Sequence, residues 1–215
     1  MMEIFSPGEG EYTEKKSRFI GELISARSGQ EAAAFVEAKR KQYHDARHHC
    51  SAYVIAGSDG QAVSRFSDDG EPSGTAGKPI LEVLEGQSLV NAVCVVTRYF
   101  GGVLLGTGGL VRAYTQAAKA AVDAAVLVER QQGFPLSITT DYTDYGRLEY
   151  LLRDQNIPIV DSRFEANVIL ECMVPVCLRD NLTSRITEAT GAKALLEYKD
   201  ETGFGVAGEK IILYN

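Results

Sequence analysis

The 215-residue sequence predicts an α+β protein of two domains. Three observations carry this prediction. Strand-like and helix-like patterns alternate along the first 130 residues, a polar segment ending in glycine follows (Arg130-Gln-Gln-Gly133), and a new βαββαβ order begins after it. A chain of this length can bury one large core or two smaller ones. We therefore expect an N-terminal domain over residues 1–130 and a C-terminal domain over residues 134–215.

The first domain is predicted to mix strands and helices. Two short β-like segments are joined by the turn signal Ser58-Asp59-Gly60, which predicts a hairpin. Pro79 stands near the first turn of a short helix, where proline is favoured, and a later alanine-rich helix suits close packing against a sheet. The predicted elements are strands over residues 18–25, 51–56, 62–67 and 91–97, and helices over residues 30–43, 79–85 and 109–126.

The second domain has a recognisable order of elements. They are strands over residues 136–142, 157–164, 168–176 and 194–198, and helices over residues 144–155 and 179–190. This βαββαβ order is typical of a split-βαβ, ferredoxin-like sandwich. Residues 203–208 are expected to loop back before a last edge strand over residues 210–214.

Composition is that of a globular protein, with 45% hydrophobic and 24% charged residues. The start MMEIFSPGEGEYTEKK lacks the apolar core of a signal peptide, and no segment approaches the roughly 18 apolar residues of a membrane helix. The four cysteines, at positions 50, 94, 172 and 177, show no CxxC spacing, so a disulfide framework is not expected. We expect a cytoplasmic protein without a membrane partner.

The net charge of −7 argues against a general affinity for nucleic acid, because neutralising phosphates requires surplus Lys and Arg. Any such contact must be local. The first 130 residues hold 14 basic and 16 acidic residues, a net charge of −2, whereas the remainder holds 8 and 13, a net charge of −5. The first domain is therefore the better place for an anionic ligand.

The stretch RYFGGVLLGTGGLVRAY, residues 98–114, holds five glycines between two arginines. It follows a predicted strand and opens a helix, the context in which free backbone N–H groups bind anions. We expect Arg98 and Arg112 to converge on one accessible hollow there. The spacing is neither GxxxxGK[ST] nor GxGxxG, and tight turns or close packing explain glycines equally well. The glycines are Gly101, Gly102, Gly106, Gly108 and Gly109.

The loop over residues 68–77 offers three carboxylates, Asp68, Asp69 and Glu71, beside Lys78. They would suffice for a cation or for acid–base chemistry, but the EF-hand pattern is missing. Solvated turn residues are the favoured interpretation. The residues of this motif loop are Asp69, Gly70, Glu71, Pro72, Gly74 and Thr75.

All three histidines, His44, His48 and His49, fall in the segment HDARHHC at residues 44–50. His44 and His48 at i, i+4 on a helix end, with Cys50 nearby, raise a metal hypothesis, but a zinc site needs a fourth ligand. We therefore predict no metal. The basic residues beside the histidines are predicted to form an electropositive edge, with His48 and Cys50 as supporting residues; they are Lys39, Arg40, Lys41 and Arg47. Positive charge also suits a helix C-terminus. Histidine neighbours in sequence do not make Cys50 a nucleophile.

Three motifs together resemble the IMPACT family in its two-domain bacterial form. They are ARHHCSAY at residues 46–53, FSDDGEPSGTAGKP at residues 66–79 and VTRYFGGVLLGTGGLVRAY at residues 96–114. The similarity spans about residues 16–128. It implies an N-terminal domain with the fold of the second domain of a small-subunit ribosomal protein, and a C-terminal domain similar to the fifth domain of elongation factor G.

The resemblance also bears on function, though fold alone does not fix it. Eukaryotic relatives look like translational regulators acting through a partner of a stress kinase, and bacterial members suggest nucleic-acid or ribosome binding. The sequence shows no additional partner-binding domain before the motifs, so we do not extend the kinase-partner interaction to it.

Two functional hypotheses follow. The first is a non-enzymatic protein that binds RNA, ribosomal components or translation factors and regulates translation. It would use Arg98, Arg112, Lys78, the five glycines and His48, without a cofactor. The second is a small-molecule enzyme in which Leu105-Gly-Thr-Gly-Gly109 holds a phosphate, and Asp69 or Glu71 binds metal or acts as a base. The first is favoured because the serine-rich loop of the related metabolite kinases is missing.

Overall fold

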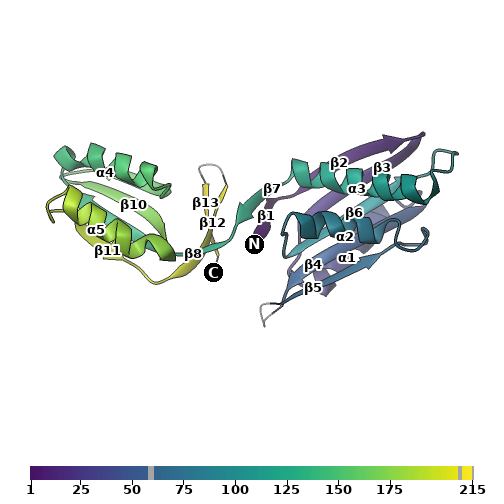
Figure 1. Cartoon of the computed structure of the whole chain (residues 1–215), viewed down its shortest axis with the longest axis horizontal. Coiled ribbons are helices and arrows are strands. Elements are labelled where there is room, and N and C mark those ends of the chain that lie inside the picture. The colour runs from purple at the N-terminus through teal and green to yellow at the C-terminus, as the bar shows by residue number, and fades with distance from the viewer. Residues whose placement is uncertain (58–60, 208–209, 215) are drawn as a thin grey trace. The chain divides into compact units, whose positions relative to one another are not determined.

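The structure is a computed structural model that describes residues 1–57, 61–207 and 210–214. The chain forms two compact units, Met1–Val128 and Glu129–Asn215, each with helices packed on mainly antiparallel strands (Figure 1). The predicted α+β class with two domains is therefore confirmed. The boundary lies at residues 128 and 129, slightly before the predicted linker. The predicted hairpin turn at residues 58–60 lies outside the described residues.

The N-terminal unit is built on a five-stranded antiparallel sheet of order β2-β3-β6-β4-β5. Its strands are β2 (Gly8–Glu14), β3 (Ser17–Ser25), β4 (His48–Ala56), β5 (Ala62–Ser67) and β6 (Ala92–Tyr99). A separate pair joins β1 (Met2–Ser6) to β7 (Val126–Glu129). The central strand β6 is buried along almost its whole length, as its run of apolar residues predicts.

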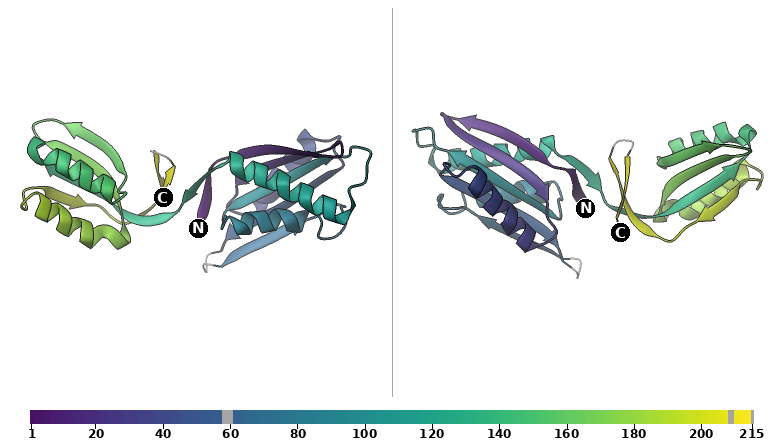
Figure 2. Two further views of the ribbon diagram at one scale, coloured as in Figure 1. Left: turned by 45° about the horizontal axis from the view of Figure 1, so that its top comes forward. Right: turned by 180° about the vertical axis from the view of Figure 1, so that it is seen from behind.

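Helices cover both faces of this sheet, as the two views in Figure 2 show. The helices α2 (Gly77–Gly86) and α3 (Gly106–Ala124) share the larger apolar core with one face. The helix α1 (Gly29–Gln42) packs a smaller cluster against the other face. The side chain of Ser28 caps α1 by accepting a hydrogen bond from the N–H of Glu31.

Small residues bring α3 unusually close to β2 and β3. A Cβ atom at Gly10 would lie 2.5 Å from the backbone of Ala120, and one at Gly21 would lie 2.3 Å from the carbonyl oxygen of Ala117. Ala117 and Ala121 are fully buried in this contact. We call this contact the glycine–alanine seam; it holds α3 against β2 and β3.

The C-terminal unit shows the predicted βαββαβ order followed by two additional strands. Its elements are β8 (Gln131–Thr140), α4 (Tyr142–Asp154), β9 (Ile159–Phe164), β10 (Val168–Pro175), the 3₁₀ turn η1 (Val176–Leu178), α5 (Arg179–Ala189), β11 (Leu195–Tyr198), β12 (Thr202–Ala207) and β13 (Lys210–Tyr214). The core strands run in the order β11-β8-β10-β9, all antiparallel. Helices α4 and α5 share a separate apolar core with this sheet.

Two predictions for the C-terminal unit are wrong. The polar segment at residues 130–133 is not a linker, because β8 already begins at Gln131 and residues 131–133 pair with β12. Gly133 is glycine because a Cβ atom there would lie 2.5 Å from the carbonyl oxygen of Val174. Residues 203–207 form a strand, not a loop, since they pair along their length with β13.

Candidate functional site

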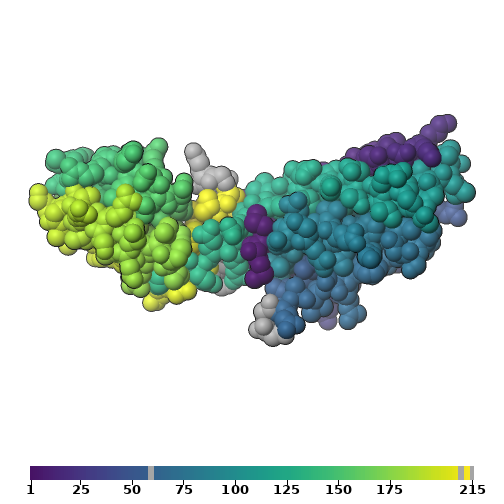
Figure 3. Space-filling view, viewed as in Figure 1, coloured from purple at the N-terminus to yellow at the C-terminus, as the bar shows by residue number. Residues whose placement is uncertain are grey.

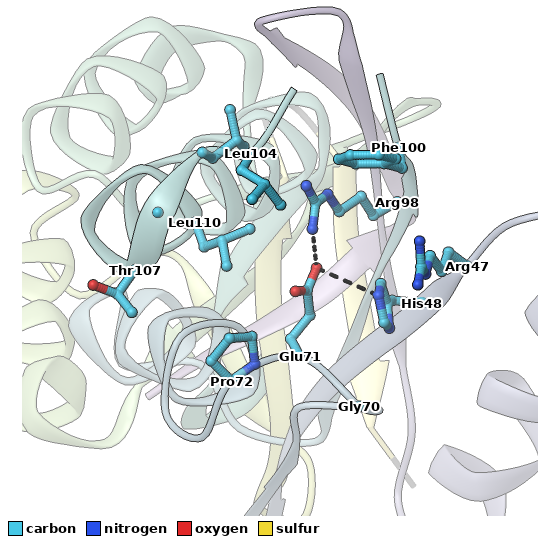
Figure 4. A pocket seen from close by; sticks show the side chains of 12 residues that line it. Arg47, His48, Gly70, Glu71, Pro72, Arg98, Phe100, Leu104, Thr107 and Leu110 are labelled. Carbon is cyan, nitrogen blue, oxygen red and sulfur yellow. Dashed lines mark hydrogen bonds and ion pairs between the residues drawn. The ribbon is translucent and has the colours of Figure 1, made fainter. Parts of the chain in front are cut away.

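A hollow of about 390 Å³ opens at the end of the N-terminal sheet where β4 begins and β6 ends. It is also lined by the loop between β5 and α2 and by the first turns of α3. Figure 4 shows side chains from these four segments around the same space. We call it the Arg98 hollow, after the side chain at its floor. Its polar lining includes Arg47, His48, Glu71 and Thr107 besides Arg98.

Arg98 is only 5% exposed, and its charge is compensated by one carboxylate. Its Nη1 donates a hydrogen bond of 2.5 Å to Oε1 of Glu71. The guanidinium also lies 5.4 Å from the ring centroid of Phe19 and 5.6 Å from that of Phe100. Its buried Nε finds no hydrogen-bond partner in the described part of the chain. In Figure 4 the group points from β6 toward Leu104 and the start of α3. The guanidinium is thus held at the hollow by one ion pair and two aromatic rings.

Glu71 connects Arg98 to a buried polar network. Its Oε1 also accepts a 2.9 Å hydrogen bond from the Tyr114 hydroxyl, which in turn lies 3.3 Å from the Cys50 thiol. Burial raises the pKa of both Cys50 and Tyr114 above their ordinary values, so both groups stay protonated. The same Glu71 oxygen lies 3.9 Å from Nε2 of His48. The carboxylate is thus held in place by groups on β4, β6 and α3.

The other two loop carboxylates have structural partners. Asp68 accepts hydrogen bonds from the backbone N–H groups of Gly74, Ala76 and Gly77 at the start of α2. This contact supplies the helix cap that Ala76 cannot make. Asp69 accepts hydrogen bonds from the His49 N–H and from Arg40. The predicted role of solvated turn residues is therefore wrong for these carboxylates, because they hold the loop against the sheet.

The rest of the motif loop divides between lining and support. Gly70 and Pro72 line the Arg98 hollow. Thr75 is buried and its hydroxyl donates to the Pro72 carbonyl, while Gly74 adopts a positive φ of 74°.

The helix α3 starts at the hollow without a side-chain cap. Leu105 occupies the N-cap position and makes no capping hydrogen bond, and Gly106 and Thr107 of the first turn line the hollow. Unfilled N–H groups at a helix start carry a partial positive charge. Gly106 adopts a φ of 73°, a left-handed conformation that favours glycine.

The remaining glycines of this stretch lie outside the lining. A Cβ atom at Gly101 would lie 2.1 Å from the carbonyl carbon of Lys16, so this residue lets two turns pass closely. Gly102 follows in the same turn, while Gly108 and Gly109 lie within α3. Of the five glycines, Gly106 alone belongs to the described lining. The glycines therefore serve the turn and, at one position, the hollow.

The expectation that Arg98 and Arg112 converge is wrong. Arg112 lies six residues into α3, nearly two turns beyond the helix start, and it is exposed and absent from the lining. Lys78 is exposed on α2 with Glu82 at 3.9 Å and does not line the hollow either. Arg47 takes the place expected of Arg112, since it lines the hollow 5.9 Å from the Phe100 ring centroid.

The histidines do not form the geometry of the metal hypothesis. The helix α1 ends at Gln42 and His48 begins β4, so His44 and His48 are not one turn apart on a helix. Neighbouring strand residues also point to opposite faces, which separates His49 from both His48 and Cys50. Among the residues that the structure describes, no three His, Cys, Asp or Glu side chains are grouped to hold a metal ion.

Cysteine reactivity gives a direct test of this arrangement. Cys50, Cys94 and Cys172 are buried, and burial raises the pKa of Cys94 and of Cys172 to about 12, whereas Cys177 is exposed. We expect a disulfide reagent at pH 8 to modify one thiol in the native protein and four after denaturation, because the thiolate is the reactive form. Mass spectrometry should place the native modification at Cys177. Rapid native labelling of Cys50 would contradict the network described above.

Sequence reasoning did not single out the apolar rim of the hollow. Phe100 is 41% exposed and Leu104 is 83% exposed, and both line the opening beside Arg47. The apolar neighbours of Leu104 in the sequence suggest a buried residue. Its exposure between β6 and α3 becomes apparent only from the fold.

Comparisons with known proteins agree with this architecture. The model of the Impact N-terminal domain matches residues 15–122, and that of a domain of unknown function, DUF1949, matches residues 138–193. The IMPACT family member YvyE of Bacillus subtilis is 40% identical over 187 residues, covering 87% of this chain and 85% of that protein. The family member YigZ of Escherichia coli is 36% identical, covering 86% of this chain and 92% of that protein.

A solved structure described as that of a hypothetical protein shares this fold. It is 34% identical, covers 93% of this chain and 97% of that chain, and superposes with a TM-score of 0.58. In the described residues, no helix is long and apolar enough to cross a membrane. The two domain models match the chain in this order, and the relatives are similar to it over most of their length. The chain therefore belongs to the IMPACT family.

Proposed function

We propose that the N-terminal domain binds RNA, free or within the ribosome, through the Arg98 hollow and its rim, and that the protein regulates translation in this way. The observation that supports it best is the meeting of cations, an exposed aromatic ring and an uncapped helix start at one hollow. Proteins hold single-stranded nucleic acid by stacking bases on aromatic rings and by placing cations along the phosphates. Phe100 suits the first task and Arg47 the second.

Local positive charge supports the proposal despite the net charge of −7. The turn that carries Lys15 and Lys16 lies against Gly101, next to the rim. Arg18 stands opposite Tyr99 at the same end of the sheet, although Glu11 pairs with it. These three side chains are exposed. Lys15 and Lys16 therefore add to Arg47 near the hollow, whereas Arg18 faces the opposite side of the sheet from Arg98.

The small-molecule enzyme of the second hypothesis is less well supported. It requires Asp69 or Glu71 to bind metal or to act as a base. Asp69 is engaged by Arg40 and by the His49 N–H, and Glu71 is buried against Arg98. Both oxygens of Asp69 are therefore engaged, and Oε1 of Glu71 is shared by Arg98 and Tyr114.

RNA binding is tested with a fluorescent single-stranded RNA whose anisotropy is followed at several salt concentrations. We expect Arg47→Ala to weaken binding about tenfold and to lower the salt slope by about one, because one phosphate contact is lost. Arg65→Ala is the matched control, since Arg65 is an exposed arginine on β5 outside the hollow, and it should bind like the parent. Equal binding by the two variants, or no binding by the parent, would overturn the proposal.

A further inference from the structure

The histidine in the Arg98 hollow has a fixed orientation. Nδ1 of His48 lies 2.8 Å from the backbone carbonyl oxygen of Asp69. A carbonyl oxygen only accepts hydrogen bonds, so Nδ1 carries the proton and the neutral ring keeps its lone pair on Nε2. Gly70 follows Asp69 with a φ of 85°, a left-handed conformation that favours glycine. The loop therefore sets the tautomer of His48.

The lone pair of His48 is directed toward the hollow. The residue lines it, and Figure 4 shows the ring turned toward Glu71, whose Oε1 lies 3.9 Å from Nε2. Because Arg98 and Tyr114 hold the carboxylate through hydrogen bonds, its position does not depend on His48. An imidazole whose Nδ1–H is fixed by the Asp69 carbonyl, with Nε2 in the hollow, is oriented as a general base requires.

An anion can be held beside this base by groups that the network leaves unused. Glu71 holds the Arg98 guanidinium through Nη1, and the group points toward Leu104 and the start of α3. The uncapped first turn of α3 lines the same hollow. Positive groups fixed beside a phosphate stabilise the negative charge that develops on its oxygens during transfer.

We propose that the Arg98 hollow cleaves single-stranded RNA by intramolecular phosphoryl transfer, with His48 as the general base. Nε2 of His48 takes the proton of a ribose 2′-hydroxyl. The 2′-oxygen then forms a bond to the adjacent phosphorus while the bond from phosphorus to the 5′-oxygen breaks. The 5′-oxygen takes a proton from water, and His48 returns its own to solvent. The products are a 2′,3′-cyclic phosphate and a 5′-hydroxyl, so no oxidant, metal or second substrate is needed.

This inference rests on the proposed RNA binding, and the experiment separates the two. Cleavage is followed with end-labelled single-stranded RNA in the presence of a chelator, and the new ends are identified by mass spectrometry. Binding is measured in parallel with the same sequence carrying 2′-O-methyl groups, which cannot react. Parent protein should produce cyclic phosphate ends. Binding without such ends overturns the catalytic inference alone, whereas failure to bind overturns the proposed function as well.

Two variants prepared in parallel identify the base. His48→Asn keeps an N–H near the Asp69 carbonyl but removes Nε2. We expect it to cleave at least 100-fold more slowly, in line with the usual contribution of a general base, when both proteins are saturated with RNA. His44→Asn changes an exposed histidine outside the hollow and should cleave like the parent. Equal rates for the parent and His48→Asn would overturn the role of His48 and assign the cleavage to another source.

Discussion

Replacing Glu71 by alanine is expected to destabilise the N-terminal domain by about 3–5 kcal/mol, the usual cost of removing one partner of a buried ion pair. The side chains of Arg98 and Glu71 are 7% and 4% exposed, so the arginine left behind could not recover its hydration. The Tyr114 hydroxyl would also lose its acceptor. The free energy of unfolding is measured in urea with hydrogen exchange in peptides from β6 as the probe. These peptides report on the N-terminal domain alone.

An exposed pair supplies the control for this prediction. Arg18 and Glu11 are joined at 2.7 Å, but their side chains are about half exposed. Glu11→Ala should therefore cost no more than about 1 kcal/mol. A double variant, Glu71→Leu with Arg98→Met, should recover part of the stability lost by Glu71→Ala, because it removes both charges. A loss below about 1 kcal/mol in Glu71→Ala would show that the pair is not buried in solution.

Adding one methyl group to the glycine–alanine seam is expected to cost about 3 kcal/mol, at the upper end of the usual range for overpacking. In Gly21→Ala the new Cβ atom would lie 2.3 Å from the Ala117 carbonyl oxygen, a backbone atom that cannot turn aside. The helix α3 would have to move off the sheet and take its first turn with it. RNA binding should therefore fall together with stability. Stability is measured by urea unfolding with the β6 exchange probe.

The matched control is Gly86→Ala in the same domain. Gly86 ends α2, and a Cβ atom there meets no other atom within 4 Å. Its free energy of unfolding should stay equal or rise by up to about 1 kcal/mol, because alanine is the better helix former. Similar destabilisation in the two variants would mean that glycine flexibility, not the seam, determines the effect.

Much of the fold follows from local patterns. The buried strand β6 and the alanine-rich helix α3 have strong periodic signals, and both occur close to their predicted positions. Strands without such a signal were missed: β2 alternates charged residues with glycines, and β12 contains Gly203 and Gly205. Their strand structure comes from pairing with neighbours distant in sequence, which a local pattern does not contain.

The candidate site was predictable only in part. The motifs around Glu71, Arg98 and His48 indicated segments that come together in the fold, since all three residues line one hollow. Sequence could not show that Glu71 neutralises Arg98, because the two residues come together only when the loop folds onto the end of β6. For the same reason it overestimated Arg112, whose place along α3 depends on where that helix begins.

The network around Glu71 can form only late in the synthesis of the N-terminal domain. The network draws its side chains from four separate segments of the chain: His48, Glu71, Arg98 and Tyr114. The last of these segments is α3, which ends at Ala124. During synthesis, the contacts around Arg98 and Glu71 stay incomplete until α3 has left the exit tunnel and packed on the sheet. A shortened product that stops before α3 would therefore lack both the Tyr114 contact to Glu71 and the helix start that lines the hollow.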